Sequence, residues 1–201
     1  MIAIIDYDAG NIKSVEKAMD HFGQEALITR DPRSIMGADK AILPGVGAFG
    51  DAMARLAEYD LISVIRDFVA TGRPFLGICL GLQLLFEESD ESPGVPGLSL
   101  LKGKILRLPD REGYKIPQIG WNSLELMNNG RLFKGVDEGA FVYFVHSYYL
   151  KAEDPGIVTA VSEYTAPVHA SVEKDNIFAC QFHPEKSSDV GLKIIENFIH
   201  L

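Results

Sequence analysis

The chain has 201 residues, and its 47% hydrophobic and 23% charged side chains are typical of a folded protein and exclude intrinsic disorder, collagen and coiled coil. Its length fits a single domain over residues 1–201, and its net charge of −9 makes nucleic acid and anionic membranes poor partners. Because no apolar run approaches the ~18 residues of a membrane span and the only cysteines are Cys79 and Cys180, we expect a cytoplasmic protein without membrane segment, disulfide framework or clustered metal site.

The first half of the sequence alternates apolar strand patterns with helical ones. Short β-branched runs predict strands, and apolar positions three or four residues apart predict amphipathic helices that end at Gly23 and Gly72. Such alternation is typical of a parallel sheet covered by helices on both faces, so we expect an α/β fold. The predicted strands are 1–5, 26–29, 40–43 and 74–78, and the predicted helices are 12–22, 51–57, 61–71 and 80–88.

The second half has a different pattern, in which short apolar runs are separated by glycine and proline. We interpret these runs as strands of an antiparallel or mixed sheet that extends the parallel one. A final amphipathic helix is predicted over residues 190–200. The predicted strands are 104–108, 123–127, 141–145, 157–161, 168–172 and 177–182.

The segment Gly77-Ile-Cys79-Leu-Gly81 joins a predicted strand directly to a predicted helix. This pattern resembles a nucleophile elbow, in which the nucleophile lies on a strained turn between two residues without side chains. The positive end of the following helix favours negative charge on sulfur, and the main-chain N–H of Leu80 would face an oxyanion. We therefore predict that Cys79 is a nucleophile and that Cys180, inside an apolar strand, is a buried inert thiol.

A nucleophilic thiol needs a base, and the base needs a group that orients it. The segment His183-Pro-Glu185 ends the predicted strand 177–182, so its side chains would lie at the edge of the sheet where α/β proteins bind ligands. Pro184 restricts the backbone there and holds Glu185 close enough to accept a hydrogen bond from the imidazole. Cys79, His183 and Glu185 are thus a candidate triad.

Three further segments have weaker signals. The loop Pro44-Gly-Val-Gly47 follows a strand and could bring main-chain amides close to an oxyanion, whereas no phosphate-binding loop is present. His146 ends an apolar strand, where it is equally well explained as a hydrogen-bonded core residue or as part of a pocket wall. The acidic cluster at 87–92 is typical of a solvated helix end.

Together, the loop ending at Gly47, the elbow around Cys79 and the His183-Pro-Glu185 segment resemble the class I, or triad, glutamine amidotransferases over essentially the whole chain. Within that superfamily the chain is most similar to the glutaminase subunits of imidazole glycerol phosphate synthase. That similarity rests on Leu82, where anthranilate and aminodeoxychorismate relatives usually have His, and on the segment Gly120-Trp-Asn122.

The resemblance implies a flavodoxin-like fold and hydrolysis of glutamine to glutamate and ammonia, without cofactor or metal. It implies that the ammonia passes to a (β/α)₈-barrel cyclase subunit, in a heterodimer that serves histidine biosynthesis. The implied roles are nucleophile for Cys79, general base and acid for His183, and orienting group for Glu185. The remaining implied roles are an oxyanion hole from the amides of Gly47 and Leu80, glutamine binding by Gln83, Glu91, Ser147 and Tyr148, and a partner interface near Asn11 and Trp121.

Two alternatives stay open from the sequence. One is a glutaminase of the same fold that serves another synthase, for anthranilate, aminodeoxychorismate or pyridoxal phosphate. The other is a cysteine hydrolase of the same fold that works without a partner. Leu82 and the segment Gly120-Trp-Asn122 argue against the first, and a glutaminase assay with and without candidate partners distinguishes the second.

Overall fold

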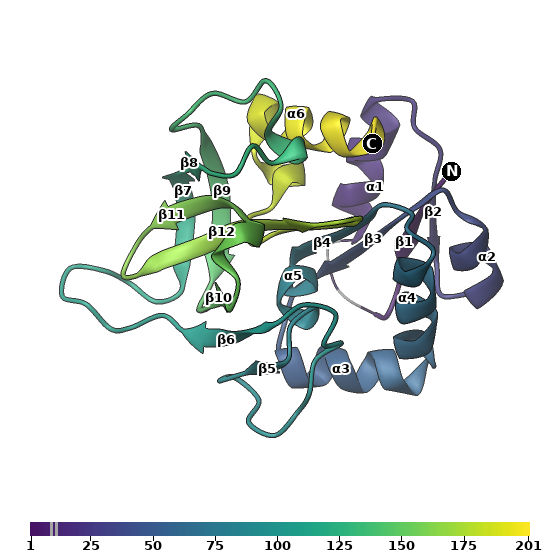
Figure 1. The fold of residues 1–201 in the computed structure, drawn as a ribbon, viewed down its shortest axis with the longest axis horizontal. Coiled ribbons are helices and arrows are strands. Elements are labelled where there is room, and N and C mark those ends of the chain that lie inside the picture. The colour runs from purple at the N-terminus through teal and green to yellow at the C-terminus, as the bar shows by residue number, and fades with distance from the viewer. Residues whose placement is uncertain (9, 11) are drawn as a thin grey trace.

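The computed structural model describes residues 1–8, 10 and 12–201. Its centre is an eight-stranded sheet in the order β2-β1-β3-β4-β13-β12-β11-β8 (Figure 1). The parallel part consists of β1 (Ile2–Ile5), β2 (Ala26–Thr29), β3 (Lys40–Gly45), β4 (Phe75–Cys79) and β13 (Ile177–Cys180). The antiparallel extension consists of β12 (Pro167–Lys174), β11 (Val158–Glu163) and β8 (Glu125–Leu126). The predicted α/β fold is confirmed.

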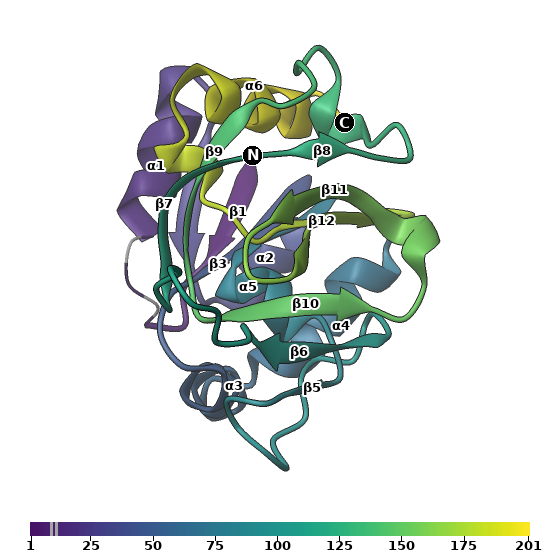
Figure 2. The same cartoon turned by 90° about the vertical axis from the view of Figure 1, so that its left-hand side faces the viewer.

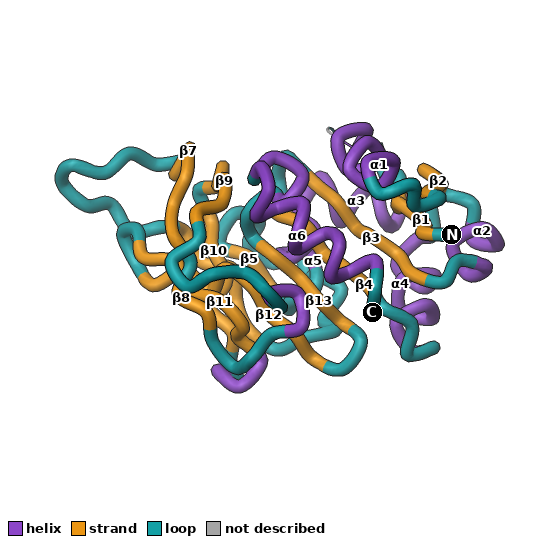
Figure 3. The backbone as a smooth tube through the Cα atoms, turned by 90° about the horizontal axis from the view of Figure 1, so that it is seen from above, coloured by secondary structure: helices purple, strands orange, loops and turns teal. Residues whose placement is uncertain are grey.

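Helices cover both faces of this sheet. Figure 1 shows α1 (Ile12–His21) and α6 (Ser188–Ile199) on one side of it, and Figure 3 shows α6 lying across its strands. The remaining helices are α2 (Pro32–Gly37), α3 (Phe49–Glu58), α4 (Leu61–Ala70) and α5 (Leu80–Leu84).

The strand β1 explains why two layers of helices are needed. Its side chains point alternately to the two faces, so Ile2 and Ile4 belong to the core that contains residues of α1 and α6. Ala3 and Ile5 belong to the other core, which contains residues of α3 and α4. All four side chains are buried. A strand that is apolar on both faces is therefore covered twice.

Two smaller sheets flank the end of the large one (Figure 2). A two-stranded ribbon pairs β7 (Gln118–Ser123) with β9 (Phe141–His146). A three-stranded sheet has the order β10-β6-β5, with β10 (Tyr148–Ala152), β6 (Gly103–Arg107) and β5 (Glu88–Ser89). Ser147 alone separates β9 from β10, so it links the two small sheets. Short 3₁₀ helices occur at η1 (Arg131–Phe133), η2 (Pro155–Ile157) and η3 (Pro184–Lys186).

Two predicted elements are wrong in extent. The helix predicted over 80–88 ends at Leu84, because the loop that follows takes its last carbonyl groups: Leu98 N–H donates to Leu84 O at 2.8 Å and Leu100 N–H to Leu85 O at 2.9 Å. The strand predicted over 123–127 is divided between β7 and β8, which belong to different sheets. The chain changes sheets at the buried Leu124.

The elements α2, β5 and β10 were not predicted from the sequence. The helix α2 has a clear start signal that was overlooked, since the side chain of Asp31 accepts from Ser34 N–H at 2.8 Å and Pro32 occupies the first turn. In the part of the chain that the structure describes, no helix is both long and apolar enough to cross a membrane.

Candidate active site

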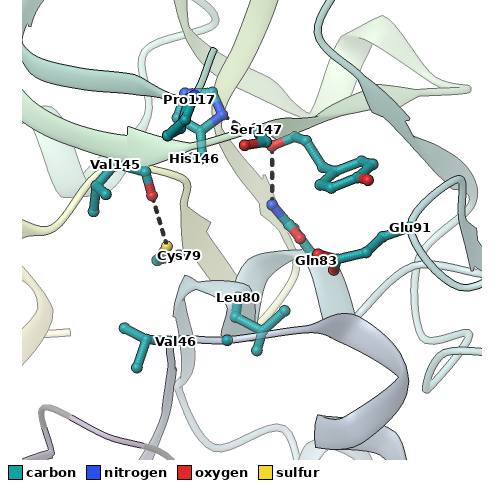
Figure 4. Close-up of a pocket in the computed structure, with 11 residues that line it drawn as sticks. Val46, Cys79, Leu80, Gln83, Glu91, Pro117, Val145, His146 and Ser147 are labelled. Atoms are coloured by element: carbon teal, nitrogen blue, oxygen red, sulfur yellow. Dashed lines mark hydrogen bonds between the residues drawn. The ribbon is translucent and has the colours of Figure 1, made fainter.

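A cavity of about 280 Å³ lies where β3 and β4 end, against the β9–β10 turn (Figure 4). Seven of the residues predicted from the sequence line it, although they come from four separate segments of the chain. These residues are Gly47, Cys79, Leu80, Gln83, Glu91, Ser147 and Tyr148. Val46, Pro117, Val145 and His146 complete the lining.

Cys79 lies on a turn with the strained backbone that the sequence predicts. Its φ of 56° and ψ of −109° are unusual for a residue with a side chain. A Cβ on Gly77 would lie 2.7 Å from Gly81 O, and one on Gly81 would lie 1.8 Å from Leu43 O. Both flanking glycines are therefore required by close backbone approach, and the strand β4 runs into α5 without a gap.

His183 and Glu185 form a buried pair beside this turn. Nδ1 of His183 lies 2.8 Å from Oε1 of Glu185, and both side chains are almost completely inaccessible. Burial lowers the pKa of His183, but the electrostatic influence of the nearby Cys79 and the contact with Glu185 outweigh it, so that the pKa is raised above its ordinary value. Nε2 of His183 has no hydrogen-bond partner among the described residues, which leaves it available for proton transfer.

The loop that precedes α3 forms the opposite edge of the cavity. Gly47 has a φ of 104°, and a Cβ placed on it would meet no atom within 4 Å. Leu80, the first residue of α5, lines the cavity next to Cys79. The two residues predicted to supply oxyanion donors thus lie in the wall of the same cavity as the thiol.

Gln83 and Glu91 present oxygen atoms to the far part of the cavity. Nε2 of Gln83 donates to the main-chain oxygen of Tyr148 at 3.0 Å, so its amide nitrogen is turned toward the protein. Oε2 of Glu91 accepts from Phe49 N–H at 2.7 Å, at the start of α3. The acidic cluster is therefore not only a solvated surface: Glu87, Glu88 and Asp90 are exposed, whereas Glu91 is half-buried and lines the cavity.

Two predicted residues lie outside this group. Trp121 is on β7 and is 53% exposed, with its ring packed edge-to-face on Tyr143 at 6.1 Å between centroids. Asn11, predicted at the same interface, lies outside the residues that the structure describes.

His146, whose role the sequence left open, is both a wall residue of the cavity and a hydrogen-bonded core residue. Nδ1 lies 2.9 Å from Tyr148 O and Nε2 lies 3.1 Å from Oε1 of Gln118. Burial lowers its pKa to about 4, and the nearby positive charge of His183 acts in the same direction.

Gln181, a fully buried polar residue two positions before His183, was not predicted from the sequence. The signal that could have identified it is a glutamine within a run of apolar residues predicted to be a strand.

Comparison with known proteins gives one consistent group of relatives. The family "Glutamine amidotransferase class-I" matches residues 3–201. The chain is 50% identical over 198 residues to the imidazole glycerol phosphate synthase subunit HisH of Bacillus cereus strain G9842, covering 98% of this chain and 93% of that protein. It is 48% identical over 198 residues to HisH of Caldanaerobacter subterraneus subsp. tengcongensis, covering 98% and 97% of the two chains.

Solved structures agree on the fold. The structure of PurLQS from Thermotoga maritima superimposes with a TM-score of 0.76 at 21% identity, covering 99% of this chain and 97% of that one. A crystal structure of a glutamine amidotransferase also gives a TM-score of 0.76 at 21% identity, covering 98% and 99%. At such identities the agreement concerns the backbone arrangement.

Proposed function

The chain belongs to the class-I glutamine amidotransferases, and we propose that it releases ammonia from glutamine for the cyclase subunit of an imidazole glycerol phosphate synthase. The observation that carries this proposal is the site itself: a thiol on a strained turn beside a buried His183–Glu185 pair, in a chain that aligns over nearly its full length with HisH subunits. The match over residues 3–201 also supports a single amidotransferase domain.

The proposed reaction begins with attack of the Cys79 thiolate on the carboxamide carbon of glutamine. The tetrahedral intermediate collapses when His183 gives its proton to the nitrogen, the C–N bond breaks, and ammonia leaves. A thioester of glutamate remains. Water, deprotonated by His183, attacks this thioester, the C–S bond breaks, and glutamate leaves. The raised pKa of His183 supports this order, because it favours a protonated imidazole at the start.

Attack of the thiolate and attack of water each give a tetrahedral intermediate with negative charge on the former carbonyl oxygen. We assign the stabilisation of this charge to the main-chain N–H groups of Gly47 and Leu80, because both residues line the cavity together with Cys79. Glu185 orients the imidazole through the 2.8 Å contact at Nδ1 and stabilises its cationic form without taking the proton.

The far part of the cavity would hold the amino-acid end of glutamine. The nitrogen of Gln83 is engaged by the protein, so its oxygen faces a ligand donor, and Glu91 adds a carboxylate. Two acceptors suit the α-ammonium group, whereas Ser147 and Tyr148 lie on the β9–β10 side and are assigned to the α-carboxylate. This arrangement favours free glutamine over a glutamine side chain within a peptide.

The outer face of the β7–β9 ribbon is the surface that we assign to the partner. Ile119, Trp121 and Phe141 are 63%, 53% and 56% exposed, so this face is apolar and open. It continues to Val145, whose main-chain oxygen lies 4.0 Å from the Cys79 sulfur. A subunit that covers this face would sit next to the point where ammonia is released, and we propose that it is the (β/α)₈-barrel cyclase of a heterodimer through which ammonia is channelled.

We also infer a cytoplasmic location for this histidine-biosynthetic reaction. Cys79 and Cys180 are both free thiols, which suits a reducing compartment.

The deciding experiment is a glutaminase assay on the purified chain, alone and with the cyclase subunit of the same organism and its ribotide ligand. We expect glutamate release in the assembled complex and its loss in Cys79→Ala. A complex in which Cys79→Ala hydrolyses glutamine at the wild-type rate would contradict the proposal. Activation by an anthranilate or aminodeoxychorismate synthase subunit instead would identify the alternative partner.

A further inference from the structure

A buried row of hydrogen bonds connects the wall of the cavity to the thiol. The amide nitrogen of Gln83 donates both to Tyr148 O and to Oε1 of Gln181, each at 3.0 Å. Nε2 of Gln181 in turn lies 3.8 Å from Sγ of Cys79. Gln83 is only 5% exposed and Gln181 is completely buried, so water does not compete with these contacts.

The main-chain oxygen of Tyr148 determines which atom of each glutamine side chain donates and which accepts. A backbone carbonyl can only accept, so the side chain of Gln83 must turn its nitrogen toward Tyr148. The second N–H of that nitrogen then requires an acceptor, which makes Oε1 the atom that Gln181 turns toward Gln83. The nitrogen of Gln181 is left facing the sulfur. The orientation of the Gln181 amide that faces Cys79 is therefore set by Gln83 and the main-chain oxygen of Tyr148.

The sheet register holds Gln181 in place. β13 and β4 are parallel neighbours in which Cys180 lies opposite Ile78, so the next residue of each strand is Gln181 and Cys79. The main-chain N–H of Gln181 donates to Ala170 O at 2.8 Å. Backbone and side chain are therefore both restrained, and the amide cannot turn away without breaking buried hydrogen bonds.

We propose that Gln181 is a further catalytic residue, whose side-chain amide donates a hydrogen bond to the Cys79 sulfur and stabilises the thiolate, while Gln83 and Tyr148 orient it. This inference rests on the proposed role of Cys79 as nucleophile. An N–H donor strengthens its bond as negative charge collects on the acceptor. The main-chain oxygen of Val145, 4.0 Å from the sulfur, can accept a hydrogen bond from the neutral thiol. The thiol of Cys79 therefore has an acceptor in Val145, and its thiolate has a donor in Gln181.

The test measures the rate at which iodoacetamide alkylates Cys79 as a function of pH, with the labelled peptide identified by mass spectrometry. Gln181→Met removes the donor at similar volume, and we expect the midpoint of the rate profile to rise by about one pH unit, which corresponds to about 1.4 kcal/mol. Ser171→Ala is the matched control. Its hydroxyl is also fully buried, on the neighbouring strand β12, and donates to Ala179 O at 2.8 Å without contacting Cys79.

A second variant tests the same row without changing Gln181 itself. Gln83→Leu removes the group that fixes the polarity of Gln181, and we expect a shift in the same direction but smaller. A wild-type profile in folded Gln181→Met, or in folded Gln83→Leu should Gln181→Met fail to fold, would overturn the inference. Retention of the wild-type profile by Ser171→Ala is the expected result, and a shift as large as that of Gln181→Met would equally overturn it.

Turnover in the cyclase-activated complex adds an independent measurement. Gln181 does not line the cavity, so we expect Gln181→Met to lower kcat about tenfold and to leave KM within about twofold. An increase in KM with unchanged kcat would contradict a contact to the reacting sulfur. The alkylation profile needs no glutamine, so it still tests Gln181 if the complex proves to have no glutaminase activity and the proposed function fails.

Discussion

The two walls of the cavity are built in opposite ways. One is main chain: the loop that contains Gly47 and the turn at Cys79, both with positive φ. The other consists of buried polar side chains, in which both ring nitrogens of His146 and the amide nitrogens of Gln83 and Gln181 contact protein partners. We refer to them below as the glycine wall and the amide wall.

The glycine wall has features of a structure that can change. Val46 is 37% exposed, and Gly47 has space around it. The hydroxyl of Tyr7 is buried against Gly45 with no hydrogen-bond partner among the described residues, which costs about 1–3 kcal/mol and favours any arrangement that satisfies it. The amide wall carries no such cost. The difference suggests that the glycine wall regulates the reaction, whereas the amide wall keeps the reacting groups aligned.

The largest effect is expected from the thiol of the glycine wall. Cys79→Ala should abolish glutamine hydrolysis, with a loss of about 10⁵-fold or more in kcat, since the covalent step needs the sulfur. Glutamate release by the assembled complex is the measurement. Synthesis from added ammonia should survive, because only the source of ammonia is lost.

Cys180→Ala is the matched control for that change. This thiol is fully buried one residue away from Gln181, and burial raises its pKa well above the ordinary value, so it is not a nucleophile at neutral pH. We expect glutaminase activity within a few-fold of the wild type. If Cys180→Ala lost activity as completely as Cys79→Ala, the assignment of the nucleophile would be wrong.

A smaller loss is expected when the orienting group is changed. Glu185→Gln keeps the size of the side chain but removes the charge that stabilises the imidazolium of His183, so kcat should fall by about 10³- to 10⁴-fold. Steady-state kinetics of the complex provide the comparison with Cys79→Ala. Equal and complete loss in both variants would mean that Glu185 is needed for the fold or has another role.

Regulation through the glycine wall gives the third prediction. The isolated chain should hydrolyse glutamine very slowly, because an oxyanion donor on the loop at Gly47 can be turned away from the cavity. Ligand-bound cyclase should raise kcat by about 10²- to 10³-fold, the usual contribution of one such donor, with a smaller change in KM.

The measurement is the rate of glutamine hydrolysis by the chain alone, with cyclase, and with cyclase plus ribotide. A chain that reached its full rate alone, with no gain from ligand-bound cyclase, would contradict both the regulation and the partner. A change confined to KM would indicate improved substrate binding instead.

The glycine wall was largely predictable from sequence spacing. In the amide wall, Gln83 was named only through the family resemblance, His146 stayed undecided and Gln181 was missed. Gly77, Cys79 and Gly81 are neighbours in the sequence, and the requirement for a strained turn is local, so spacing alone revealed it. Gln181 and Gln83 are 98 residues apart, and their contact depends on the pairing of β13 with β4.

The same reason explains the error in the extent of α5. The helix predicted to continue to residue 88 ends early because Leu98 and Leu100, distant in sequence, take its carbonyl groups. Local periodicity carries no information on such tertiary hydrogen bonds. The strained turn at Cys79 was found because its signal lies in neighbouring residues, whereas Gln181 was missed because its role depends on strand pairing.

The smallest effect concerns the pH dependence of stability, and it tests how rigid the amide wall is. Burial lowers the pKa of His146 from 6.5 to about 4 in the folded protein. Below pH ~6.5 the unfolded chain binds a proton that the folded chain does not, so folding loses free energy as the pH falls toward about 4. The full loss is roughly 3 kcal/mol, at about 1.4 kcal/mol per pH unit.

His146→Gln removes the titrating group from the amide wall and keeps a side chain that can hydrogen-bond Tyr148 O. Denaturant unfolding of both proteins between pH 8 and pH 4 gives the difference in unfolding free energy. We expect this difference to be constant above pH ~6.5, where His146 is neutral in both states, and to change in favour of the variant at lower pH. A difference that stayed constant down to pH 4 would show that the folded wall accepts a proton on His146, either by admitting water or by rearranging, and would contradict its rigidity.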